Sequence, residues 1–129
     1  RAFSRYGTRI PAWCTAAGRV ILAYSSRKMI DLIPEDLTAY TLNTITNRDA
    51  LIAELDTVRT EGFSVNRGEL DESVWSMGVP VWSTAAVPIA AVSFSAPADR
   101  FQKRDIVADA EWLRELARSL SRRLGSTPA

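Results

Sequence analysis

The clearest hydrophobic pattern lies near the C-terminal end of the chain, where apolar residues recur at alternating steps of four and three. These residues are Ile106, Ala110, Leu113, Ala117, Leu120 and Leu124. The spacing predicts an amphipathic helix of about five turns that packs this stripe against a core. Charged residues lie between them at helical spacings that allow ion pairs on the solvent face, namely Glu111, Glu115, Arg118 and Arg122.

Two shorter helices are predicted in the first third of the chain. Residues 14–24 begin with small side chains and continue with a mostly apolar run, and residues 25–33 begin with a serine cap and stop at Pro34. The small residues Ala16, Ala17 and Gly18 have two interpretations. They let the helix pack tightly against a sheet, or they let an anion approach the backbone N–H groups at the helix start. The sequence alone favours packing.

A third helix is predicted over residues 47–61. Thr46 is the expected N-cap, with Asp49 in the capping-box position, and Gly62 follows where a helix C-terminus commonly has glycine. The helix would bury one face through Leu51, Leu55 and Val58, with Ile52 beside them.

Three strands are predicted after this helix, over residues 63–67, 74–82 and 87–95, with a turn at 83–86. The first strand alternates apolar and polar residues and should be half-buried. Pro80 in the second strand requires an edge, a bulge or a break in the ladder. Three helices, three clustered strands and a long final helix define an α+β fold class.

The composition narrows the function classes. The chain has 129 residues, 16 Lys and Arg, 15 Asp and Glu, no His and a single cysteine, Cys14. One domain of this size can carry its own core, but it has no disulfide framework, no His-based acid–base chemistry and no usual zinc ligand set. The net charge of +1 gives no electrostatic footprint for nucleic acid. No apolar run approaches the ~20 residues of a membrane span.

These features predict a cytoplasmic binding module rather than an enzyme, with no catalytic residue, cofactor, metal or membrane partner. The first residue is arginine rather than methionine, so we expect a piece of a longer protein. Residues 126–129 are small and polar, which predicts a flexible tail.

Two groups of residues are candidates for chemistry on their own. Glu69, Asp71 and Glu72 could form a carboxylate pair, although a solvated acidic loop is the more ordinary interpretation. Cys14 near a helix start could be a reactive thiolate, but without a His partner a small buried hydrophobe is favoured.

Polar residues on the predicted strands form a third candidate. Ser93 and Ser95 share one strand face, Ser76 joins them in the matching register, and Asn66 can extend the group. Hydroxyls and an amide that converge in an apolar sheet suit a pocket for a small polar ligand. Alternatively, they face water on the outer side of the sheet, and spacing does not separate the two.

Several segments, in order along nearly the whole chain, resemble the C-terminal effector-binding domain of IclR-type bacterial transcriptional regulators. They are residues 7–23 (GTRIPAWCTAAGRVILA), 41–45, 58–63, Gly68-Glu69, 76–81 and 89–97. Within the family, the run from Pro11 looks most similar to the branch that regulates aromatic-acid catabolism through the β-ketoadipate route. The chain departs from the family pattern at Gly78, where alanine is usual, at Trp82-Ser83, and in the missing glycine turn before Val87.

The resemblance implies a GAF-like fold, a curved antiparallel sheet flanked by helices, with residues 1–125 forming an effector-binding domain that lacks its first strands. It also implies a winged helix-turn-helix domain, absent from this chain, that binds operator DNA, and assembly into homodimers or tetramers.

The resemblance also assigns roles to individual residues. The backbone amides of Ala16 and Ala17 would meet the carboxylate of an effector, and Asn66, Ser76, Ser93 and Ser95 would line the rest of the pocket. The family often has an acidic residue in place of Asn66 and a cysteine in place of Ser76. Trp13, Trp75 and Met77 are further candidates for the lining, although core packing is their default role.

The combined prediction is the ligand-sensing domain of a DNA-binding transcriptional regulator, which binds a small aromatic or keto acid without turning it over. The alternative is a dimerisation or tetramerisation module with a vestigial pocket. An enzyme that uses Asp71 and Glu72 is the least favoured hypothesis.

Overall fold

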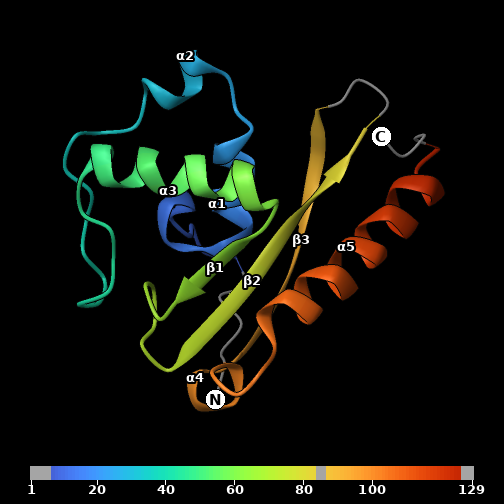
Figure 1. Ribbon diagram of the computed structural model, residues 1–129. Coiled ribbons are helices and arrows are strands. Elements are labelled where there is room, and N and C mark those ends of the chain that lie inside the picture. The colour runs from blue at the N-terminus through green and yellow to red at the C-terminus, as the bar shows by residue number, and fades with distance from the viewer. Residues whose placement is uncertain (1–6, 84–86, 126–129) are drawn as a thin grey trace.

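The computed structural model describes residues 7–83 and 87–125, and its architecture is α+β (Figure 1). The elements in chain order are the 3-10 turn η1 (Ala12–Cys14), α1 (Ala16–Ala23), α2 (Arg27–Ile30), α3 (Arg48–Glu61), β1 (Ser64–Arg67), β2 (Val74–Trp82), β3 (Pro88–Pro97), α4 (Ala98–Phe101) and α5 (Ile106–Arg123). The predicted fold class, the order of the predicted elements and the long final helix are confirmed, whereas η1, α4 and the extension of β3 to Pro97 were not predicted.

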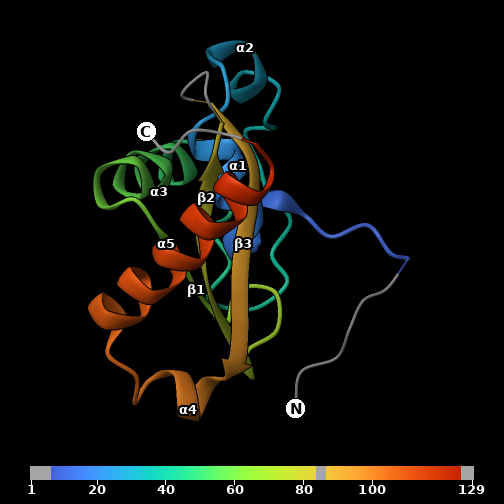
Figure 2. The ribbon, with the colours of Figure 1, turned by 90° about the vertical axis from the view of Figure 1, so that its right-hand side faces the viewer.

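The three strands form one antiparallel sheet in the order β1-β2-β3. Helices α1 and α3 lie on one side of this sheet and α5 runs along the other (Figures 1 and 2). Successive side chains of a strand point to opposite faces, so each helical layer meets its own set of strand residues.

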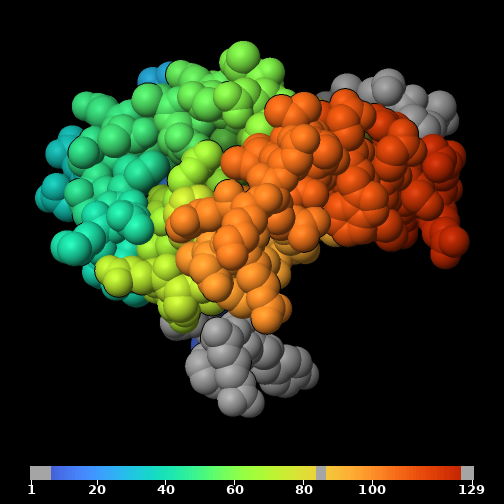
Figure 3. Space-filling view, turned by 60° about the horizontal axis from the view of Figure 1, so that its bottom comes forward, coloured from blue at the N-terminus to red at the C-terminus, as the bar shows by residue number. Residues whose placement is uncertain are grey.

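Two apolar cores follow from this layering. The first joins α1 and α3 through Val20, Leu51, Leu55 and Val58, with residues 30–37 closing it. The second lies between the sheet and α5, and its buried members are Val65, Met77, Val79, Val81, Phe101, Ala110, Leu113 and Ala117. In the space-filling view, the orange and red surface of α5 lies directly beside the green surface of α3 (Figure 3).

The starts of the first helices differ from the prediction. Residues 14–24 divide at Thr15, which is extended (φ −125°, ψ 150°) and caps α1 by accepting a hydrogen bond from the Gly18 N–H. Residues 25–33 contain only the four-residue α2, capped by Ser26.

The third helix begins one residue later than predicted. Asn47, not Thr46, is the N-cap of α3, and its side chain accepts from the Ala50 N–H. Thr46 does not cap the helix. Its carbonyl instead accepts a hydrogen bond from the Leu37 N–H, beside the isolated β-bridge between Asp36 and Asn47. Gly62 has the predicted left-handed conformation after the helix (φ 81°).

The strands and α5 also depart from the simplest pattern. β1 is buried at three successive residues rather than half-buried, because both of its faces are covered. Pro80 lies beyond the last β1–β2 pair, Ser64 with Gly78, so it removes no hydrogen bond to β1. Near the end of α5 the buried residue is Ser121. The predicted Leu120 and Leu124 are instead 36% and 63% exposed.

Two of the predicted segments lie partly or wholly outside the residues that the structure describes. The turn at 83–86 lies, apart from Ser83, outside the described residues, as does the tail at 126–129. No helix among the described residues is both long and apolar enough to cross a membrane.

Candidate ligand-binding site

The polar strand residues lie in two rows across the face of the sheet that α1 covers. Asn66, Ser76 and Ser95 are partners in one row, and Ser64, Gly78 and Ser93 are partners in the next. The antiparallel register therefore brings Ser76, Ser93 and Ser95 together on one face, as the matching register required.

The start of α1 lies directly on the second row. A Cβ atom at Gly78 would be 3.0 Å from the backbone carbonyl carbon and oxygen of Ala16 and 3.2 Å from the nitrogen of Ala17. The hydroxyl of Ser64, which is Gly78's partner on β1, donates to the Ala16 carbonyl at 2.6 Å. Glycine at position 78 thus allows the close approach between helix and sheet that fixes this end of α1.

A cavity of about 370 Å³ opens between the helix start, these strand rows and the loop after β1. It is lined by Ile10, Thr15, Ala16, Ala17, Asn66, Leu70, Asp71, Val74, Ser76, Ser93 and Ser95. The six main residues predicted for the site all line this one cavity. Thr15, Ile10, Leu70, Asp71 and Val74 were missed, because no local pattern indicates which loop residues fold over a sheet.

Polar groups without partners characterise this cavity. Ser76 is only 7% exposed, yet neither its hydroxyl nor those of Ser93 and Ser95 has a hydrogen-bond partner within residues 7–83 and 87–125. The first N–H groups of a helix have no acceptor inside the helix, and those of Ala16 and Ala17 find none elsewhere in the described chain. Ser76 is buried, whereas Ser93 and Ser95 are exposed, so the unpaired hydroxyls and amides around this cavity are open to a ligand or to water.

Asn66 differs from the serines because its amide is already engaged. Its Nδ2 donates to the Cys14 carbonyl at 2.9 Å and its Oδ1 accepts from the Glu69 N–H at 2.9 Å. Asn66 therefore ties the segment before α1 to the loop after β1 and holds two walls of the cavity together.

The acidic loop after β1 is not uniformly solvated. Glu69 is 5% exposed and forms a buried ion pair with Arg19, which is 1% exposed. Arg19 also donates to the carbonyls of Trp13 and Val65, at 2.9 and 3.3 Å. The interpretation of Glu69 as a surface residue is therefore wrong, because an arginine fifty positions away in the sequence neutralises it.

The other two acids do not form a paired site. Asp71 accepts from the N–H and hydroxyl of Ser73, at 2.9 and 2.7 Å, and Glu72 is exposed. No group of three metal-ligating side chains occurs within the described residues. Cys14 is fully buried, as favoured by the sequence.

The three further lining candidates lie elsewhere. Trp13 packs on the first core, with its ring centroid 6.4 Å from that of Tyr40. Met77 is buried in the second core, where Trp75 packs with its ring centroid 5.9 Å from that of Phe101. The structure does not place them on the cavity, and their default role in packing describes them.

Comparison with known proteins identifies the class. The family model described as "Bacterial transcriptional regulator IclR C-terminal" matches residues 1–122, so the chain belongs to the IclR family of transcriptional regulators and is its C-terminal domain. The relatives are regulators rather than enzymes, which confirms the prediction of a non-enzymatic role.

Among curated relatives, the HTH-type transcriptional regulator KdgR of Escherichia coli is 35% identical over 127 residues, covering 97% of this chain and 48% of KdgR. The chain spans about half the length of the first curated relatives it matches.

Two solved structures show the same fold. A transcriptional regulator from Rhodococcus, RHA06195, has a TM-score of 0.85 and 33% identity, over 95% of this chain and 51% of that one. A double mutant of the PobR inducer-binding domain from Acinetobacter, in complex with 3-hydroxybenzoic acid, has a TM-score of 0.77 and 28% identity, over 94% and 73% of the two chains.

Proposed function

We propose that the cavity beneath α1 binds a small carboxylic acid, aromatic or keto, and that its occupancy controls a separate DNA-binding domain. One observation carries this proposal: three serine hydroxyls and two helix-start amides, none of them paired with another described residue, surround one cavity of about 370 Å³. Natural ligand pockets run from roughly 300 to 1,000 Å³, so this one suits a small ligand.

Different parts of the lining would contact different parts of the ligand. A carboxylate is best placed at Ala16 and Ala17, because helix N-termini offer free N–H groups and a partial positive charge. The serines then hydrogen-bond polar substituents. Ile10, Leu70 and Val74 form an apolar wall for a ring or a short carbon chain. The complex of the PobR domain with 3-hydroxybenzoic acid supports an aromatic acid as one class of ligand.

The position of the ligand's contacts would determine how occupancy of the cavity affects the DNA-binding domain. A bound acid would touch both the start of α1 and the outer rows of the sheet, and Asn66 links these walls to the loop after β1. A ligand that binds one arrangement of these walls better than another shifts the population toward it. The domain would pass that shift on as a coupling free energy between sites.

We further propose the domain organisation that the resemblance implies. Residues 1–125 form the effector-binding domain, preceded in the whole protein by the first strands of the sheet and by a winged helix-turn-helix domain that binds operator DNA. The length of the relatives supports this organisation, because they are about twice as long as the matched region. Assembly as homodimers or tetramers belongs to the same proposal.

A thermal-shift panel tests the ligand class on this chain and on a longer one. The ligands are protocatechuate, 4-hydroxybenzoate, β-ketoadipate, pyruvate and phenol as an uncharged control. A ligand at 100 times its Kd stabilises the folded state by about 2.7 kcal/mol, which raises the Tm by several degrees. A rise with the acids but not with phenol is expected. No shift with any acid in the longer chain, at millimolar concentration, would contradict the proposal.

A second candidate function is a dimerisation module with a vestigial pocket. It is favoured by the apolar residues that α5 leaves exposed, with Trp112 at 56%, Leu116 at 40% and Leu120 at 36%. Leu120→Glu places a charge on this face without touching the buried seam. A change from dimer to monomer in light scattering, with unchanged circular dichroism, would support an interface on α5.

A further inference from the structure

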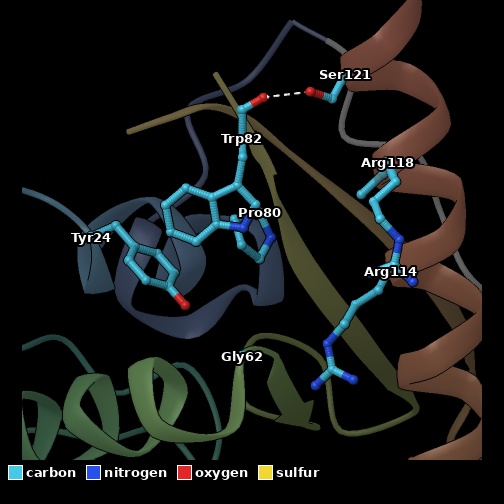
Figure 4. A pocket seen from close by; sticks show the side chains of 8 residues that line it. Tyr24, Gly62, Pro80, Trp82, Arg114, Arg118 and Ser121 are labelled. Atoms are coloured by element: carbon cyan, nitrogen blue, oxygen red, sulfur yellow. Dashed lines mark hydrogen bonds between the residues drawn. The ribbon is translucent and has the colours of Figure 1, made fainter. Parts of the chain in front are cut away.

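A second cavity lies at the opposite ends of α1 and β2 from the first, and the two share no lining residue. It measures about 190 Å³ and is lined by Tyr24, Gly62, Pro80, Trp82, Arg114, Ala117, Arg118 and Ser121 (Figure 4). It exists because β1 begins only at Ser64, opposite Gly78, so that beyond Gly78 no strand on this side of β2 fills the space between the end of α3 and α5.

Hydrogen bonds and ring contacts fix the walls of this second cavity. The Ser121 hydroxyl donates to the Trp82 carbonyl at 2.7 Å, which ties α5 to the end of β2. The rings of Tyr24 and Trp82 meet edge to face, with centroids 4.9 Å apart. Arg114 Nη2 donates to the Glu61 carbonyl at 2.7 Å, so the guanidinium lies across the C-terminal end of α3.

The lining is rich in donors and positive charge. It contains two guanidinium groups and no carboxylate. Their acidic partners lie on the outer face of α5: Glu115 is 2.7 Å from Arg118 and Glu111 is 3.7 Å from Arg114, and both carboxylates are 68% exposed. Exposed pairs of this kind are weak and readily exchanged. Because a guanidinium has five N–H donors, Arg114 can keep its hydrogen bond to Glu61, and both arginines can still donate to an anion in the cavity.

Two neutral donors complete the lining. Neither the Tyr24 hydroxyl nor the Trp82 indole N–H has a hydrogen-bond partner among the described residues. Burial raises the pKa of Tyr24, and the nearby charges of Arg59 and Arg114 only oppose that effect, so the phenol keeps its proton at neutral pH. Figure 4 shows this hydroxyl and the Arg114 guanidinium facing the same space above Gly62.

We propose that this cavity is a second binding site, for a planar aromatic carboxylate of one ring. The ring would pack against Trp82 and Pro80, and the carboxylate would accept from Arg114, Arg118 and the Tyr24 hydroxyl. The volume fits this class, because a closed cavity of about 150 Å³ holds benzene. A bare inorganic anion would leave the indole and proline walls without a partner.

The test uses benzoate and its neutral analogue benzamide as probes on the 129-residue chain. Nuclear magnetic resonance follows the indole N–H of Trp82, assigned by its loss in Trp82→Phe. We expect benzoate to move this signal saturably, and benzamide to bind at least about tenfold more weakly, because charge-assisted hydrogen bonds are lost.

Three variants assign the binding. Arg118→Gln should weaken the benzoate titration of the Trp82 signal about tenfold, whereas the matched Glu115→Gln, which removes the same ion pair but keeps the cation, should not weaken it. Ser93→Ala, in the first cavity, should leave this titration unchanged. An unmoved Trp82 signal at saturating benzoate, or equal affinities for Arg118→Gln and the parent chain, would overturn the proposal.

Discussion

The two faces of the sheet are built from the same strands but have opposite contents. On the α5 face, Val65, Met77, Val79 and Val81 are at most 4% exposed and meet a continuous apolar seam. On the α1 face, the same strands present serines and a glycine to the first turn of a helix. The comparison teaches that period-two alternation lets one face exclude water and stabilise the domain while the other presents serine hydroxyls to a cavity.

The largest predicted effect on stability comes from the buried ion pair between Arg19 and Glu69, on the α1 side of the sheet. Arg19→Met should lower the free energy of unfolding by about 3–5 kcal/mol, because it leaves Glu69 buried without a counter-ion. Urea denaturation followed by circular dichroism measures the loss. The double variant Arg19→Met with Glu69→Leu should recover much of it. A loss below about 1 kcal/mol in the single variant would mean that the buried ion pair adds little to stability and that the apolar core under α5 supplies most of it.

The seam on the α5 face gives the next largest effect. Leu113→Ala should cost about 3 kcal/mol of stability, because it leaves a cavity at a residue that is 1% exposed. Leu116→Ala, on the same helix but 40% exposed, is the matched control and should cost far less. Both are read from the same urea midpoints. Ligand affinity of the folded fraction should not change, and a parallel loss of affinity would mean that the faces are not independent.

The contact between α1 and the sheet gives an intermediate effect. Gly78→Ala should cost about 1–2 kcal/mol and weaken ligand binding together, because the added Cβ forces back the Ala16 carbonyl and with it the helix start. Calorimetric unfolding and ligand titration of the same sample measure both quantities. Unchanged affinity would show that the position of the helix start does not matter to the ligand.

Single hydroxyls on the α1 face give the smallest effect and the finest distinction. Ser76→Ala should weaken effector binding by about 1 kcal/mol, and Ser93→Ala likewise, with stability unchanged to within about 0.5 kcal/mol. The matched control Ser64→Ala removes a hydroxyl that is already bonded to the Ala16 carbonyl, so it should lose stability. Wild-type binding by both Ser76→Ala and Ser93→Ala would remove the serines from the site.

The fold was predictable from local sequence wherever one pattern decided the outcome. The stripe through Ala110, Leu113 and Ala117 gave the buried face of α5 because hydrophobic spacing alone fixes which side packs. The pattern failed at Leu120, because the sheet ends nearby and the Trp82 carbonyl takes Ser121 as its partner. Similarly, Thr46 has the chemistry of an N-cap, but a bridge to residues 36–37 holds it outside the helix.

The site was predictable only in part. Strand alternation placed Ser93 and Ser95 on one face, but the register that adds Ser76 and Asn66 depends on pairing between distant segments. The prediction that the backbone amides of Ala16 and Ala17 line the site came from the family resemblance and not from a local pattern. The pairing of Arg19 with Glu69 and the loop wall at Leu70 and Val74 arise from tertiary contacts that no local spacing encodes.

The stretch of β2 beyond Gly78 has a consequence for solubility during folding and storage. An uncovered strand edge offers its backbone groups to other chains and is a common start of aggregation. Here Pro80 has no N–H to offer, and the carbonyl of Trp82 is already occupied by Ser121. This short edge is therefore a poor template for a foreign strand, and the irregularity that a proline brings to a sheet acts as protection against misassembly.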